Sequence, residues 1–166
     1  MPFTMESVAH YFNAEKKESI YFIAIGFLAC LLSLFYLFIK KEPYYNGISY
    51  AFISIGLIQL VVGISIYLRS DIDNVRVNYC IQKDRIAIKN EEIPRMKMVM
   101  HNFVIYRWVE IALIVISLFL LFYFASKTIG KGIGLGLLIQ SSMMLLLDYL
   151  AEQRGKIYLG FLASLF

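Results

Sequence analysis

The chain has 166 residues, of which 60% are hydrophobic and 16% aromatic, and its formal net charge is +4. This composition, with a mean hydropathy of +0.67, argues against an ordinary soluble domain and favours a polytopic membrane protein. The charge does not indicate nucleic-acid binding, because it follows the loops instead of forming a basic patch with base-stacking aromatic residues. We therefore expect one membrane domain over residues 1–166, with the lipid bilayer as its first partner.

Four apolar segments are long enough to cross a bilayer as helices, and we predict spans at about residues 20–39, 47–68, 104–124 and 132–150. The first follows a mixed arm in which Asn13 is a candidate helix cap. It is as long as a full span and lacks a small-residue cleavage site, so we expect no cleaved signal peptide. The predicted fold is an all-α, antiparallel four-helix bundle in the membrane.

Small residues recur at helical spacing in two of these spans. Ser49, Gly56 and Gly63 are seven residues apart, and Gly132 and Gly136 form a GxxxG pair. Such stripes let helix backbones approach closely in lipid. We expect both stripes to pack helices inside one bundle rather than to form a dimer face.

Residues 69–103 form the only sizeable loop, and we predict that it extends the second and third spans beyond the membrane as helices. Pro94 suits the first turn of the third helix, after a start at Asn90-Glu91-Glu92. The alternating stretch 85–89 leaves an extended strand open as an alternative. The tail, residues 151–166, either lies in the interface or packs on the ends of the helices.

Positive charge orients the predicted bundle. Twelve lysines and arginines lie in the N-terminal arm, the 69–103 loop with its boundary, and the tail, against four in the two short turns. Because lysine and arginine concentrate in cytoplasmic loops, we predict that both termini and the large loop are cytoplasmic. The predicted location is the cytoplasmic (inner) membrane.

Polar residues inside the spans are few, and such residues are costly in lipid unless they face the bundle, a partner or a wet cavity. Glu110 and Asp148 lie at similar depth near the cytoplasmic boundary, and Arg107 is one turn from Glu110. We favour a layer of ion pairs that fixes helix register, over a proton or cation site or a docking surface; its members are Arg69, Arg107, Glu110, Asp148, Glu152 and Arg154. Near mid-membrane, Gln59 and Gln140 are expected to share a hydrogen bond.

No catalytic or metal-binding motif stands out. The run GKGIGLG lacks the spacing of a phosphate loop, and close helix packing explains it better. His10 and His101 are isolated from other metal ligands, and Met96, Met98 and Met100 alternate between two faces of a helix. We expect no enzyme, no cofactor and no metal site.

The stretches EEIPRMKMVM, NFVIYRWVEIAL and GLGLLIQSSMMLLLDYLAEQRGKIY resemble uncharacterised small four-span inner-membrane proteins of bacteria. The bias towards Ile, Lys, Phe and Tyr fits an AT-rich genome such as many Bacteroidota have. The resemblance implies a topology and a bacterial source, and it implies no reaction.

Two functions are consistent with the sequence. The first is a non-catalytic protein that binds another protein, such as a toxin-immunity protein or a subunit of a membrane complex. The second is an oligomeric ion channel or small transporter lined by Glu110, Asp148 and Gln140. A closed bundle with paired carboxylates favours the first, and a wet cavity reaching Gln140 and Asp148 favours the second.

Overall fold

The computed structural model describes residues 5–166, and the described chain is helical almost throughout, with no strand. Its four long helices confirm the predicted all-α bundle; they are α1 (Met5–Phe35), α2 (Pro43–Lys83), α4 (Ile93–Tyr123) and α5 (Ile129–Ala163). Three short helical segments join them, two of them π-helical; these are η1 (Tyr36–Lys40), α3 (Arg85–Ala87) and η2 (Ile88–Glu92).

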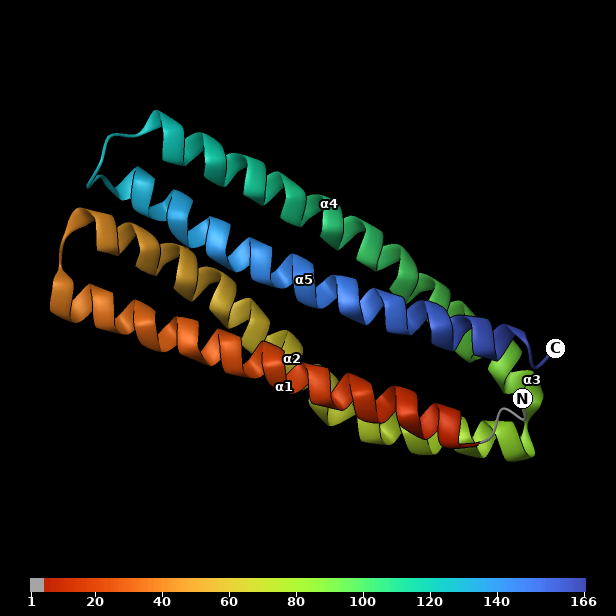
Figure 1. Cartoon of the computed structure of the whole chain (residues 1–166). Helices are drawn as coiled ribbons and strands as arrows, with labels where there is room; N and C mark the ends of the chain where they lie inside the picture. The colour runs from red at the N-terminus through yellow and green to blue at the C-terminus, as the bar shows by residue number, and fades with distance from the viewer. Residues whose placement is uncertain (1–4) are drawn as a thin grey trace.

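The long helices form two antiparallel hairpins that lie side by side (Figure 1). The α1–α2 hairpin meets the α4–α5 hairpin mainly through α2 and α5, so the helices follow the order α1, α2, α5, α4. The start of α1, the C-terminus and α3 lie at one end of the molecule, and the two hairpin turns lie at the other (Figure 1). As a result, α4 has one close helical neighbour, α5, along most of its length.

All four long helices are long and apolar enough to cross a membrane. Their outer faces leave large apolar side chains exposed, among them Val61, Phe119 and Phe122. Water-soluble monomers rarely expose apolar surface of this extent, whereas lipid solvates it well. The predicted spans lie near the hairpin-turn ends of these helices, which continue well past the spans at their other ends.

The helix ends differ from the sequence prediction in three places. Asn13 lies inside α1, so the prediction that it caps a helix is wrong. The first turn is shorter than expected, because Lys41 adopts a left-handed φ of 51° and Pro43 already starts α2. Residues 85–89 are helical, so the strand alternative is wrong; the Asp84 side chain accepts a hydrogen bond from the Ala87 N–H at 3.2 Å and caps this turn.

We call the end formed by residues 5–18, 70–103 and 151–166 the head. The predicted helical extensions of the 69–103 loop are confirmed here, since α2 runs to Lys83 and α4 starts at Ile93. The tail packs on the helix ends as part of α5, which decides between its two predicted positions. All four long helices contribute to the buried apolar core of the head, which contains Val8, Tyr11, Phe12, Val77, Ile88, Met96, Tyr158, Phe161 and Leu162.

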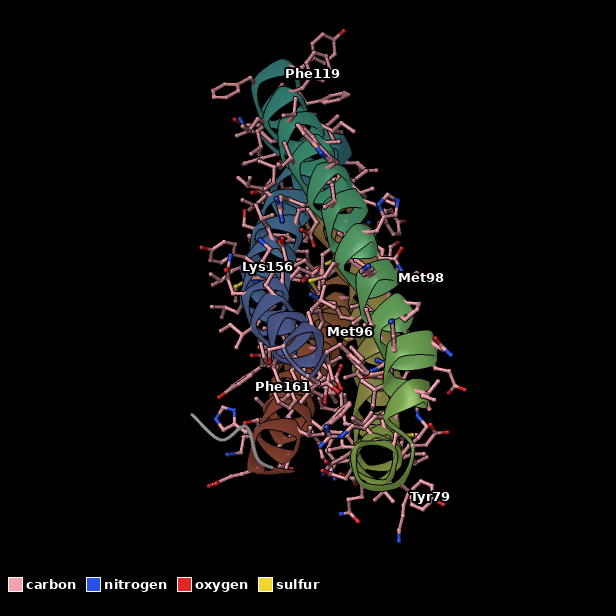
Figure 2. All side chains as sticks on the ribbon, turned by 90° about the vertical axis from the view of Figure 1, so that its right-hand side faces the viewer. Tyr79, Met96, Met98, Phe119, Lys156 and Phe161 are labelled. Carbon is pink, nitrogen blue, oxygen red and sulfur yellow. The ribbon has the colours of Figure 1, made fainter. Side chains whose placement is uncertain are left out.

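The methionines at the start of α4 show how the head is packed. Met96 is fully buried and points between the helices, whereas Met98 points away from them (Figure 2). Met100 contacts α5 at Gly155, where the absence of a side chain makes room for it. The alternation predicted for these residues therefore separates core positions from an exposed one.

Candidate functional site

A groove of about 430 Å³ runs between α4 and α5 on the head side of the apolar segments. It opens at the surface, because its lining residues Leu146 and Tyr149 are exposed. The lining is mostly apolar with four charged side chains; it consists of Phe103, Arg107, Glu110, Ile111, Ile114, Ser142, Leu145, Leu146, Asp148, Tyr149 and Glu152. We call it the acidic groove.

Glu110 is the most unusual side chain in this groove. Only Met96, Glu110 and Ser117 are buried among the 31 residues of α4. Both carboxylate oxygens of Glu110 are buried, and neither makes a well-formed hydrogen bond within the part of the chain that the structure describes. Asp148 lies beside it on α5, near enough for the two carboxyl groups to affect each other's charge. The groove therefore holds two neighbouring carboxyl groups and no cation paired with Glu110.

Arg107, the arginine one turn from Glu110, forms its ion pair with another residue. Arg107 forms an ion pair with Glu152 of α5 instead of with Glu110. Lys156, one turn further along α5, also contacts Glu152 at 2.8 Å between Nζ and Oε1. The spacing of Arg107 and Glu110 allows a pair within α4, but in the structure the carboxylate of Glu152 on the neighbouring helix is the partner of Arg107.

The other two predicted arginines are also occupied. Arg69 contacts Asp73 at 3.2 Å and Glu15 at 3.6 Å, and Arg154 pairs with Glu18 and lies over the ring of Tyr11. The predicted layer of ion pairs therefore exists in part. It includes Arg69, Arg107, Glu152 and Arg154, and it leaves out Glu110 and Asp148.

The two mid-segment glutamines are buried, but they do not bind each other. Neither amide atom of Gln59 has a hydrogen-bond partner among residues 5–166, so the predicted Gln59–Gln140 bond is absent. Gln59 packs beside Gly26 of α1, whereas Gln140 belongs to α5 and lies one turn after Gly136. The two amides do not meet because Gln59 packs against α1, although α2 and α5 are neighbouring helices.

The stripe of small residues on α2 faces α1. The Ser33 hydroxyl of α1 donates a hydrogen bond of 2.9 Å to the Ser49 carbonyl. A Cβ on Gly56 would lie 3.0 Å from the Gly26 carbonyl oxygen, and one on Gly63 would lie 3.0 Å from the Ile23 nitrogen. The two backbones are thus in direct contact, which small residues permit.

The glycines of α5 contact two different helices. Gly132 and Gly136 pack against α2, where a Cβ on Gly136 would lie 3.0 Å from the Ile48 carbonyl oxygen. Gly134 packs against α4, where an added Cβ would lie 3.0 Å from the Ser117 carbonyl oxygen. Gly130 packs against the Phe124 ring. The sequence pattern GKGIGLG therefore makes α5 the central helix between α2 and α4.

The head contains buried charges that the sequence analysis did not single out. Glu92 accepts hydrogen bonds from Arg95 at 2.6 Å, Arg76 at 3.0 Å and the Tyr158 hydroxyl at 3.2 Å. Asp73 contacts Arg76 at 3.1 Å and Arg95 at 3.5 Å. We call these five residues the head charge cluster. Their i,i+3 spacing, in Asp73–Arg76 and Glu92–Arg95, is the sequence signal that could have indicated it.

Glu15 extends this cluster to α1. It is buried, accepts a hydrogen bond of 2.9 Å from the Ser70 hydroxyl, and lies 3.6 Å from Arg69. Burial raises the pKa of Glu15 above its ordinary value of 4.5, and the Ser70 bond and the Arg69 charge only partly oppose this. Folding therefore makes the Glu15 carboxyl group harder to ionise than it is in the unfolded chain.

This raised pKa makes stability depend on pH through Glu15. Between pH 4.5 and the raised pKa, the folded state binds more protons than the unfolded state, so the free energy of unfolding falls as pH rises. Glu15→Gln should have a smaller fall, because its amide does not titrate. Unfolding followed by circular dichroism from pH 4 to 8 measures the difference, and parallel curves for the two proteins would contradict it.

Within residues 5–166, no group of three or more His, Cys, Asp or Glu side chains is arranged to hold a metal ion. A scan against protein-family models found no match, and searches of curated proteins and of solved structures found no similar protein.

Proposed function

We propose that this chain is a non-catalytic membrane protein that acts by binding another protein. In this proposal it lies in the cytoplasmic membrane as a four-span protein with both termini in the cytoplasm. The observation that carries it is the packing of α4. This helix packs on α5 alone along its apolar segment, and yet it holds a buried carboxylate, Glu110. A toxin-immunity protein and a subunit of a membrane complex both fit this description.

The contrast between the two ends of α4 supports the proposal. In the head, α4 contributes Met96 to a core shared by all four long helices, and Arg95 to the head charge cluster. Along the apolar segment, Glu110 and Ser117 are the buried residues of this helix. An intramembrane carboxylate is costly unless it has a partner, so a helix with an unpaired Glu110 and an open flank is suited to bind one.

The orientation rests on the distribution of charge. The head carries most of the lysines and arginines, together with both chain ends, whereas the opposite end carries Lys40, Lys41, Lys127 and Lys131. The positive-inside rule then assigns the head to the cytoplasm.

A second candidate function is an oligomeric ion channel or small transporter that uses Glu110 and Asp148. The observation that favours it is the placement of both carboxyl groups in one open groove. The residues that line the groove do not include Gln140, so the groove itself does not extend to this mid-segment amide. In this function several copies of the chain would line the pathway.

One experiment separates the two candidates. We expect protein purified from native membranes in mild detergent to carry a foreign protein at fixed stoichiometry, measured by light scattering and mass spectrometry. A homo-oligomer without a foreign protein would contradict the binding function and favour the channel. Ion flux in liposomes that is unchanged by Glu110→Gln and Asp148→Asn would then exclude the channel that uses these residues.

A further inference from the structure

We infer that the acidic groove receives a transmembrane helix of the partner protein, with a lysine or arginine of that helix bound between Glu110 and Asp148. This inference rests on the proposed binding function and names the kind of partner. It follows from the shape of the groove, the state of its two carboxyl groups and the pairing of the nearby cations.

The chain's own cations do not complete this site. Arg107, one turn from Glu110, is bound to Glu152, which also holds Lys156. The Glu110 side chain is 2% exposed and lines the groove without a well-formed hydrogen bond in the described chain. Two neighbouring buried carboxyl groups can share one proton, whereas one cation placed between them stabilises the charge on both. A single positive group is therefore the ligand that fits this pair of carboxyl groups.

The shape of the groove fits a helix better than a free ion. It extends from Phe103 to Ile114 on α4, a rise of about 17 Å, or roughly three helical turns. Most of its lining is apolar, including Ile111 and Leu145, and the exposed Leu146 and Tyr149 form its outer edge. An apolar groove of this length can pack the side chains of a neighbouring helix, while the two carboxylates select one with a basic residue at their depth.

The test uses the full chain, fluorescently labelled, in phosphatidylcholine vesicles. The probe is a labelled 22-residue leucine–alanine peptide with one lysine four residues from its end, and binding is measured by energy transfer. Two matched peptides carry leucine at that position, or the lysine at the middle of the peptide. We expect the first peptide to bind about tenfold more tightly than either control peptide, which corresponds to about 1.4 kcal/mol.

Variants of the protein test whether the preference for the lysine peptide arises in the acidic groove. Glu110→Gln and Asp148→Asn should each lose most of the preference for the lysine peptide, whereas Glu42→Gln, an exposed carboxylate in the α1–α2 turn, should keep it. Equal binding of the lysine and leucine peptides to the wild-type chain would overturn the inference, and so would an undiminished preference in both neutral variants.

Purification from native membranes separates this inference from the proposed function. A partner that co-purifies equally with the wild type, Glu110→Gln and Asp148→Asn would overturn the inference and leave the binding function standing. A partner lost from both variants, but kept by Glu42→Gln, would support both. Selective peptide binding without any native partner would support the groove's preference for a basic helix and contradict the proposed function.

Discussion

Glu92→Gln is expected to lower the free energy of unfolding by about 3 kcal/mol. Glu92 is 2% exposed and accepts hydrogen bonds from two arginines and one tyrosine of the head charge cluster. The amide keeps the size of the side chain but removes its negative charge, which leaves Arg76 and Arg95 with Asp73 alone. Breaking a buried ion pair from one side costs about 3–5 kcal/mol, and the partly exposed arginines place this case at the lower end.

The neighbouring residue provides a matched control for Glu92. Glu91 is exposed and belongs to the same π-helical turn, so Glu91→Gln should change stability by less than about 0.5 kcal/mol. Reversible unfolding in detergent, followed by circular dichroism, measures both variants against the wild type. Similar effects at the two positions would show that the head charge cluster does not stabilise the fold.

Gly132→Ala is expected to destabilise the protein by about 1–3 kcal/mol, the usual cost of overpacking. A Cβ at this position would overlap the Tyr44 carbonyl oxygen and lie 3.1 Å from the Gly47 Cα. Both of these atoms belong to the backbone of α2, so they cannot turn aside as a flexible side chain would. The α4–α5 hairpin must then move away from α2, and the contact between the hairpins is weakened.

Gly160→Ala is a control for which the expected change in stability has the opposite sign. A Cβ on Gly160 would meet nothing within 4 Å, and the residue lies in the exposed part of the last turns of α5. Alanine favours the helix over glycine by about 0.5–1 kcal/mol, so this variant should be slightly more stable than the wild type. Thermal unfolding of both variants in one detergent tests the pair; a gain of stability in both would mean that helix propensity and not close packing decides.

The sequence predicts where the helices of this fold lie in the chain better than it predicts which helices pack against each other. Long apolar segments identify four helices, and the mixed charges around Arg76 and Lys83 are compatible with a helix that continues into water. Which apolar face meets another helix is not visible in the pattern, because lipid tails are as apolar as leucine. The single-sided packing of α4 on α5 could therefore not be predicted, although the glycines of α5 were recognised as packing residues.

For the candidate site, too, the sequence predicts the position of single residues better than their contacts with other helices. Glu110 and Asp148 were predicted to lie together at one depth, and they do line one groove. The spacing placed Arg107 one turn from Glu110, whereas its partner in the structure, Glu152, is 45 residues away in the chain. Local spacing indicates which charges can pair within a helix, but a partner on another helix depends on packing that the spacing does not encode.

The length of α2 has a consequence for where the head operates. Residues 69–83 continue the helix for 15 residues past the predicted span, a rise of about 22 Å. At physiological ionic strength, electrostatic forces are screened over about 8 Å. In the proposed orientation, the far end of the head lies beyond the field of the lipid headgroups. Its outer surface, including the exposed Tyr79, therefore meets cytoplasmic molecules much as a soluble protein would (Figure 2).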